Sequence, residues 1–360
     1  MSYINQSAKV LRHADRITVL QAGGIPYPIN IEVDISNRCP LGCERCHFGY
    51  THTKGPLARP QDGIEDTGDL MELSLFQRIC KELADADVRS VTFTGGGEPI
   101  VHPQFPEFLA SARANGLEAG LYSSMAGSTP TKLEAIRKYC TWVVVSIDEP
   151  TKEAYQAWKG TNAFQAICRA TQELASAGSD CIVGASFLLH EGNWQKAEAM
   201  VALHKELGTD YCLFRPLVKY DLKNPSRMVE DPDEWIDVSG ERYRDGLMGV
   251  LHYLRSTHKD VEIADSKFRR YAMWNRPYTE CVAASLSGVI TPNGKVWACV
   301  NRRGYPGSCI GDLACESFAM VWNRQKRWRD FDQCRVLCRG DEVNLALQPL
   351  LLKQPHENFI

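Results

Sequence analysis

The length, composition and charge of the chain describe a globular protein of ordinary type. Its 360 residues carry 41 Lys and Arg against 44 Asp and Glu, a formal net charge of −3. This balance argues against a general nucleic-acid binder, and 44% hydrophobic with 24% charged residues excludes a disordered or fibrous chain. The length allows two domains, or one large α/β domain with an appendage.

The sequence also predicts where the protein resides. It contains no run of about 18 apolar residues, so we expect no membrane-spanning helix. The N-terminus from Met1 to Lys9 is polar and lacks the apolar core of a signal peptide. We therefore expect a cytoplasmic protein, in a compartment where thiols are kept reduced. There, 14 cysteines indicate metal binding more than disulfides.

Apolar runs rich in β-branched residues alternate with helical periodicity over the first 216 residues. Strands are predicted at residues 30–35, 90–94, 118–122, 142–147, 181–189 and 211–214. Helices are predicted at residues 74–85, 105–115, 131–139, 164–177 and 193–207, with Ser74 and Thr131 as N-caps and Gly116, Gly178 and Gly208 as stops. Six strands alternating with helices predict right-handed βαβ units in a parallel sheet, which suits a partial barrel better than a complete eight-stranded one.

The chain changes character after the sixth predicted strand. Residues 217–240 are rich in Asp, Pro and Asn and indicate a loop or linker, and residues 241–258 indicate a helix. An Asn293-Gly294 step between residues 287–290 and 296–299 predicts a β-hairpin. We expect an N-terminal extension (1–29), a barrel (30–216), a linker with a helical segment (217–267) and a smaller cysteine-rich domain (268–360).

Three cysteines follow the first predicted strand. Cys39, Cys43 and Cys46 have the spacing C-x3-C-x2-C. Three thiolates on one short loop can hold three irons of a [4Fe–4S] cluster and leave the fourth iron open to a small molecule. Zinc is the alternative, but structural zinc usually has four protein ligands, and His47 is poorly placed to be the fourth because it adjoins Cys46.

A glycine-rich segment follows the second predicted strand. It consists of Gly95, Gly96, Gly97, Glu98 and Pro99. Glycine lets the backbone approach a ligand closely, and ligands of α/β folds bind at the carboxyl ends of strands. Glu98 could accept hydrogen bonds from the ammonium group of such a ligand. A plain turn is the alternative for this segment alone, but the cysteine loop on the preceding strand favours a binding site.

In these two motifs the chain resembles the radical S-adenosylmethionine (SAM) enzymes, over residues 28–215. The resemblance implies a partial (β/α)6 barrel and a [4Fe–4S] cluster whose unique iron binds the amino and carboxylate groups of SAM. Residues 95–99 would hold the methionyl amino group. One electron from the cluster, supplied by a reductant such as flavodoxin or ferredoxin, would cleave SAM to methionine and a 5′-deoxyadenosyl radical. Arg45 departs from the family, which usually has an aromatic residue there.

The resemblance extends to polar residues near the ends of the later strands. These are Ser123, Ser124, Ser146, Asp148, Asn193 and Arg215. It implies that the first two serines contact the ribose or the methionine carboxylate, and that Ser146 and Asp148 contact the ribose or the substrate. Asn193 would contact the cofactor, and Arg215 would pair with the substrate or the cofactor carboxylate. Each could instead be a helix cap or a surface charge.

A second set of cysteines lies in the C-terminal region. The predicted hairpin brings Cys281 toward Cys299, and Cys334 and Cys338 are spaced for one face of a helical turn. Four thiolates make a closed site that suits zinc or an iron–sulfur cluster equally by ligand count. The arrangement is similar to the auxiliary-cluster domain called SPASM, or twitch in its shorter form. The full form has seven cysteines, whereas this region has six. The resemblance therefore implies a twitch-type domain with one auxiliary [4Fe–4S] cluster.

The remaining cysteines fit neither set. Cys309 and Cys315 are expected to be buried hydrophobic residues, with a further ligand or a hydrogen-atom donor as catalytic alternatives. The others, on predicted helices and strands, are expected to pack as small hydrophobic residues; they are Cys80, Cys140, Cys168, Cys181 and Cys212. Arg302 and Arg303 could line a substrate pocket, but we expect a solvated surface pair.

The auxiliary cluster suggests a reaction class. A closed cluster cannot bind substrate but can accept an electron. The resemblance to twitch-bearing aminocyclitol dehydrogenases therefore implies oxidation of an alcohol carbon in a small aminosugar-like or aminocyclitol-like substrate. The general-base candidates are His47, Asp148, a carboxylate paired with Arg215, Lys219 and Tyr220.

Three alternatives remain open. The main one is modification of a ribosomally made peptide by crosslinking, epimerisation or maturation. The 38 residues before Cys39 are too few for a fused leader-binding domain, which favours a small substrate or a separate partner. The second is a redox-neutral epimerase with a cysteine hydrogen donor, and the third is a non-catalytic iron–sulfur or zinc module.

Overall fold

A computed structural model describes most of the chain. The described residues are 2–43, 46, 69–176, 178–190, 192–217, 241–264, 267–268, 276–303, 307–331, 334 and 338–352. Several sequence predictions lie outside these residues. They are the linker predicted at 217–240 except for its first residue, the departure at Arg45, the general-base candidates His47, Lys219 and Tyr220, and the turn between Cys334 and Cys338.

The described strands form one sheet of ten, in the order β10-β9-β8-β1-β2-β3-β4-β5-β6-β7. Its central strands are β1 (Asn30–Asp34), β2 (Ser90–Thr94), β3 (Glu118–Ser123), β4 (Cys140–Ser146), β5 (Ile182–Leu189) and β6 (Tyr211–Pro216). They pair in parallel in chain order, and the short β7 (Val261–Ile263) extends the sheet beyond β6. The predicted six-stranded parallel sheet is confirmed.

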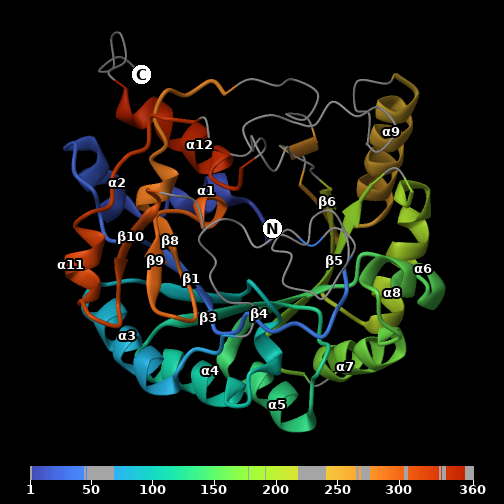
Figure 1. The fold of residues 1–360 in the computed structure, drawn as a ribbon. Helices are drawn as coiled ribbons and strands as arrows, with labels where there is room; N and C mark the ends of the chain where they lie inside the picture. The colour runs from blue at the N-terminus through green and yellow to red at the C-terminus, as the bar shows by residue number, and fades with distance from the viewer. Residues whose placement is uncertain are drawn as a thin grey trace.

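Helices cover the outside of the curved sheet (Figure 1). They include α3 (Leu73–Asp85), α4 (Phe105–Ala114), α5 (Pro130–Tyr139), α6 (Lys152–Lys159), α7 (Phe164–Ser176), α8 (Ala197–Leu207) and α9 (Glu241–Thr257). The sequence predicted all of these except α6. The core between the helices and the sheet is apolar: the Phe76 ring of α3 lies 5.6 Å from that of Phe93 in β2 and 4.9 Å from that of Phe108 in α4.

The predicted helix stops are confirmed, but the predicted N-caps are wrong. Gly208 caps α8 in the left-handed conformation with φ +70°. Helix α3 begins after Glu72, so Ser74 lies inside it. Helix α5 is capped by Thr129, whose hydroxyl accepts a hydrogen bond from the Lys132 amide, with Pro130 as the first helical residue. Proline suits that position because it has no N–H to donate, which moves the cap two residues upstream of Thr131.

The C-terminal region continues the same sheet. Strand β8 (Ser287–Ile290) pairs in parallel with β1, β9 (Lys295–Trp297) returns antiparallel to β8, and β10 (Cys309–Asp312) pairs antiparallel with β9. This confirms the predicted hairpin, whose turn includes Gly294 at φ +83°. The cysteine-rich region therefore joins the barrel through backbone hydrogen bonds to β1, and the division into domains stays a prediction.

The N-terminal helices pack on the C-terminal region. Helices α1 (Gln6–Val10) and α2 (Ala14–Gln21) lie beside α12 (Asp341–Leu351), as Figure 1 shows, and Val10 and Leu20 share an apolar cluster with Leu347. The indole of Trp322 in α11 (Phe318–Trp322) donates a 2.9 Å hydrogen bond to the Pro26 carbonyl. Among the described helices, none has the length and apolar character needed to cross a bilayer.

Candidate functional site: two sets of thiols on one sheet

The first set of thiols lies on the loop that leaves the carboxyl end of β1. Cys39, Cys43 and Cys46 are all partly exposed, and the Cys46 amide donates a 3.2 Å hydrogen bond to the Cys43 carbonyl. Burial, with a smaller contribution from Glu98, raises the pKa of Cys39 to about 12, and burial raises the pKa of Cys43 to about 11. Both thiols therefore stay protonated at neutral pH unless a metal stabilises the thiolate.

The glycine-rich segment is held against the start of this loop. The Gly97 amide donates to the Ser36 carbonyl at 3.0 Å, and the Glu98 amide donates to the Arg38 carbonyl at 2.8 Å. A Cβ atom added to Gly97 would collide with the Arg38 carbonyl oxygen. Glycine is needed here because two backbones touch, which brings together the two motifs found in the sequence.

Glu98 joins the ends of β2 and β3. Its buried carboxylate accepts hydrogen bonds from the Ser123 hydroxyl at 2.6 Å and from the Ser124 amide and hydroxyl at 2.7 and 2.6 Å. Burial raises the pKa of Glu98 above its ordinary value, although these hydrogen bonds oppose the shift. The carboxylate thus positions the strand ends, and the contacts of Glu98, Ser123 and Ser124 with SAM stay predictions.

Asp148 forms a buried ion pair that the sequence did not predict. It follows β4 with φ +67°, a conformation uncommon outside glycine, and its carboxylate pairs with Lys159 at the end of α6. The Leu188 amide donates 3.0 Å to the same carboxylate. The Lys159 carbonyl accepts a 2.8 Å hydrogen bond from Gly42, between Cys39 and Cys43, so the pair connects β4 to the cysteine loop.

Asn193 and Glu149 form hydrogen bonds just beyond the carboxyl ends of β5 and β4. The Asn193 amide group donates to the Leu188 carbonyl at 2.9 Å and to the Glu149 carboxylate at 3.1 Å, and its oxygen accepts from the His190 amide at 2.8 Å. Asn193 is fully buried by these contacts. Its predicted role toward the cofactor stays a prediction.

Arg215 on β6 and Ser146 on β4 lie on the two strands that flank β5. The Arg215 guanidinium donates a 2.8 Å hydrogen bond to the hydroxyl of Ser186 on β5, and its carbon lies 5.9 Å from the Tyr122 ring centre. Ser146 on β4 is paired in register with Ser186. The structure thus brings Ser146 and Arg215 to the same part of the sheet.

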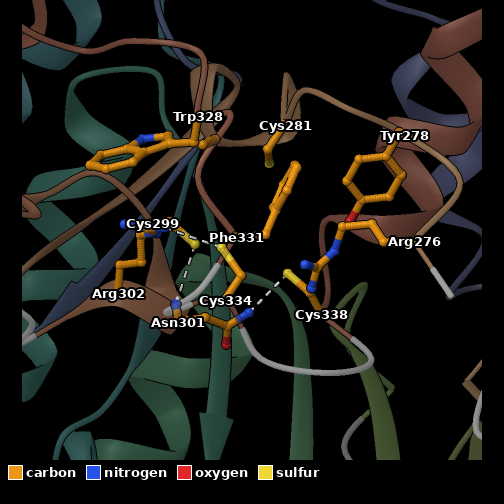
Figure 2. Close-up of a pocket in the computed structure, with 11 residues that line it drawn as sticks. Arg276, Tyr278, Cys281, Cys299, Asn301, Arg302, Trp328, Phe331, Cys334 and Cys338 are labelled. Carbon is orange, nitrogen blue, oxygen red and sulfur yellow. Dashed lines mark hydrogen bonds between the residues drawn. The ribbon is translucent and has the colours of Figure 1, made fainter. Parts of the chain in front are cut away.

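The second set of thiols lines one pocket in the C-terminal region (Figure 2). The four are Cys281, Cys299, Cys334 and Cys338, the set grouped from the sequence. They surround a space together with Tyr278, Trp328 and Phe331. Within the described part of the chain, no three His, Cys, Asp or Glu side chains converge closely enough to hold a single metal ion.

N–H groups point at the sulfur atoms of this pocket. The backbone N–H of Asn301 donates to Cys299 Sγ at 3.3 Å, and the side-chain amide of Asn301 donates to Cys338 Sγ at 2.9 Å. The Asn344 side chain donates to Cys281 Sγ at 3.3 Å. Such donors stabilise thiolate sulfur, so the donor set fits an iron–sulfur cluster.

Arg302 and Arg303 are buried, so the expected solvated surface pair is wrong. The Arg302 guanidinium lies 4.1 Å from the Trp328 ring centre and donates to the Asp330 carbonyl at 2.6 Å and to Cys334 Sγ at 3.5 Å. Arg303 forms an ion pair with Asp34 of β1. The sequence contained one signal for the ion pair between Arg303 and Asp34. Acidic residues alternate with apolar ones in the first strand, and a carboxylate that is buried on such a strand needs a cation as its partner.

The remaining cysteines are free thiols. All 14 cysteines are described, and none is in a disulfide. Cys309 and Cys315 are exposed, so the expectation that they are buried is wrong, and neither lines the pocket in Figure 2. Cys80, Cys140, Cys181 and Cys212 are buried and Cys168 is partly buried, as expected.

Comparison with known protein families agrees with this geometry. Residues 33–203 match the Radical SAM superfamily, and residues 281–341 match SPASM, an iron–sulfur cluster-binding domain. The chain belongs to the radical SAM enzymes and carries a C-terminal SPASM domain. Its cofactors therefore include SAM and the [4Fe–4S] cluster of that family, as predicted.

Among characterised proteins, the chain is 26% identical to the mycofactocin maturase MftC of Mycobacterium tuberculosis, over 85% of this chain and 73% of MftC. It is 23% identical to the PqqA peptide cyclase of Gluconobacter oxydans, over 82% of this chain and 76% of the cyclase. Among solved structures, Streptococcus suis SuiB bound to its precursor peptide SuiA superimposes with a TM-score of 0.61 at 14% identity, over 89% of this chain and 71% of SuiB. The fold is thus shared with SuiB.

Proposed function

We propose that this radical SAM enzyme modifies a peptide. The observation that carries the proposal is the similarity, over more than four fifths of this chain, to a maturase and to a peptide cyclase. Of the reactions expected from the sequence, the peptide alternative is therefore better supported than oxidation of a small alcohol.

The first thiol set is proposed to hold the SAM-binding cluster. Cys39, Cys43 and Cys46 supply three sulfur ligands, which leaves one iron of a [4Fe–4S] cluster for SAM. Gly97 keeps the glycine-rich segment in contact with the backbone before Cys39, and Glu98 fixes the adjoining strand ends. When bound, SAM and the cluster supply the radical chemistry that removes a hydrogen atom from the substrate.

The second thiol set is proposed to hold one auxiliary [4Fe–4S] cluster. Its four cysteines fill the ligand positions of such a cluster, and the donors from Asn301 and Asn344 would adjust its potential. A site closed by four thiolates suits electron transfer rather than substrate binding. An external donor such as flavodoxin or ferredoxin would supply electrons.

Anaerobic reconstitution followed by product analysis tests both proposals. We expect about eight irons per chain, from two clusters of four, and cleavage of SAM when dithionite is added. The protein is then incubated with short peptides encoded beside its gene, and in parallel with aminosugars and aminocyclitols. A peptide product of altered mass or configuration, formed with 5′-deoxyadenosine, supports the proposal. Turnover of the small alcohols with every peptide unchanged would contradict it.

A further inference from the structure

Two arginines from distant parts of the chain lie beside Tyr122 of β3, and Lys267 lies within range of their charges. Arg215 comes from the end of β6, Arg339 follows Cys338, and Lys267 lies in the short described segment after β7. The guanidinium carbons of Arg215 and Arg339 lie 5.9 and 5.8 Å from the Tyr122 ring centre. Lys267 is close enough to both arginines to interact electrostatically with them. We call these three residues the cation cluster.

Among the described residues, one member of the cation cluster has a carboxylate partner and the other two do not. Arg339 forms an ion pair with the buried Glu32 of β1. Arg215 contacts the neutral hydroxyl of Ser186, and its Nε is buried without a hydrogen-bond partner. Within the part of the chain that the structure describes, Lys267 makes no ion pair, although the charge of Glu342 and the Cys338 thiol reach it.

Among the described residues, no carboxylate pairs with Arg215 or Lys267, and such cations are costly in a partly buried position. Burial, followed by the charges of Arg215 and Arg339, lowers the pKa of Lys267 to about 8. Buried charges in proteins are normally paired, because an isolated ion loses its hydration. The arrangement is therefore incomplete without an anion. A planar guanidinium with a free N–H beside an ammonium group matches the oxygens of a carboxylate.

We propose that Arg215 and Lys267 bind a carboxylate of the substrate. The site takes an acidic group, either the C-terminal carboxylate of a peptide or the side chain of Asp or Glu. It lies beside Cys338, on the side of the barrel where the second thiol set is found. The inference rests on the proposed function only in taking the acid to be part of a peptide.

Two other roles for the cation cluster are alternatives to this proposal, and each predicts a different experimental result. In the first, the cations only balance the negative charge of the C-terminal thiolates, since Arg339 is next to Cys338. In the second, the carboxylate that they bind is that of SAM. The first role predicts no preference for acids, and the second predicts that loss of Arg215 weakens SAM binding.

The test measures binding to the reconstituted full-length protein, without turnover. The probes are pairs of short peptides. One pair differs in having a free C-terminal carboxylate or a C-terminal amide, and another differs in having Glu or Gln at an internal position. N-acetylglutamate and its diamide form a third pair. Dissociation constants are measured by calorimetry with SAM present. The variants are Arg215→Gln and Lys267→Met, and the matched control is Lys81→Met on the exposed face of α3. Iron content and SAM affinity are measured for each variant.

We expect at least one acid to bind more tightly than its amide. Each cation-cluster variant should weaken that acid roughly 10- to 100-fold, the usual effect of losing a charge-assisted hydrogen bond, and leave the amide unchanged. Lys81→Met should behave as wild type, and every variant should keep its iron and its SAM affinity. Equal binding of acids and amides, or a selective loss of SAM affinity in Arg215→Gln, overturns the proposal. An acid preference confined to N-acetylglutamate would support the carboxylate site while contradicting a peptide substrate.

Discussion

The two sets of thiols differ in how the chain assembles them. Cys39, Cys43 and Cys46 come from one loop, and residues far away in the sequence fix that loop through Gly97 and Lys159. The second set comes from separated segments and is surrounded by N–H groups that point at its sulfur atoms. The first set is thus defined by local spacing and held by backbone contacts, whereas the second exists only in the folded chain.

This difference suggests a division of labour. The three-thiol loop lies beside the glycine-rich segment, and a cluster held by it would keep one ligand position for a small molecule. The four-thiol pocket has four cysteines, the number of sulfur ligands that a [4Fe–4S] cluster takes, and lies next to Arg339 of the cation cluster. Within the described part of the chain, the other two members of that cluster, Arg215 and Lys267, form no ion pair. The predictions below test this contrast, beginning with the largest expected effect.

Removal of one thiol from each set should separate the two sites. Cys43→Ala should abolish SAM cleavage, because the cluster that SAM binds is lost. Cys299→Ala should lose about half of the iron and all peptide product but keep SAM cleavage with dithionite. Iron assay and chromatography of 5′-deoxyadenosine check both results. Cys168→Ala on α7 is the control and should match wild type; loss of SAM cleavage in Cys299→Ala would contradict the division of labour.

Loss of the Lys159 ammonium should destabilise the barrel around the first set. Lys159→Met leaves the Asp148 carboxylate buried without its partner, which costs about 3–5 kcal/mol in comparable buried pairs. Chemical denaturation measures the change in unfolding free energy. Lys152→Met, at the exposed start of the same helix, should change it by less than about 0.5 kcal/mol. Equal effects in the two variants would show that the ion pair does not stabilise this region.

An added methyl group at Gly97 should disturb the first set alone. Gly97→Ala forces the glycine-rich segment away from the Arg38 carbonyl, at a cost of about 1–3 kcal/mol, and should weaken SAM binding. The second cluster should remain intact by electron paramagnetic resonance. Gly249→Ala in α9, where a Cβ meets no atom, is the control and should raise stability by up to about 1 kcal/mol.

Loss of one N–H···S hydrogen bond should change the second site without removing it. Asn301→Leu deletes the donor to Cys338 Sγ, a bond worth about 1 kcal/mol. Because such donors stabilise the reduced cluster, the midpoint potential of the auxiliary cluster should become more negative. Redox titration measures this potential, while that of the SAM-binding cluster should stay constant. An unchanged auxiliary potential would show that the Asn301 side chain does not donate a hydrogen bond to a sulfur ligand of the auxiliary cluster.

The smallest effect concerns acid stability near the first set. Burial raises the pKa of Glu149, but hydrogen bonds from His190 and Asn193 and the charge of Lys196 outweigh it, so the pKa lies below its ordinary value. A carboxylate with a lowered folded-state pKa stabilises the protein above its unfolded pKa of about 4.3, and this contribution is lost as the pH falls through the folded value. The Tm of Glu149→Gln should therefore fall less steeply below about pH 5 than that of wild type; parallel curves would disprove the contribution.

Local patterns in the sequence determined much of this protein. The alternation of apolar strands and amphipathic helices gave the parallel barrel, and the Asn293-Gly294 step gave the hairpin, because both depend on residues close together in the chain. The C-x3-C-x2-C spacing and the glycine-rich segment identified the family for the same reason. Helix α6 was missed because it is short.

Tertiary structure alone decided which charges meet. Lys159 lies 11 residues from Asp148, and Arg303 lies far along the chain from Asp34, yet each pair is buried. The burial of Arg302 and the exposure of Cys309 follow from how β8 to β10 join the edge of the barrel. Spacing along the chain fixes which residues share a loop or one face of a helix. Long-range electrostatic partners depend on the packing of whole elements, which no local pattern encodes.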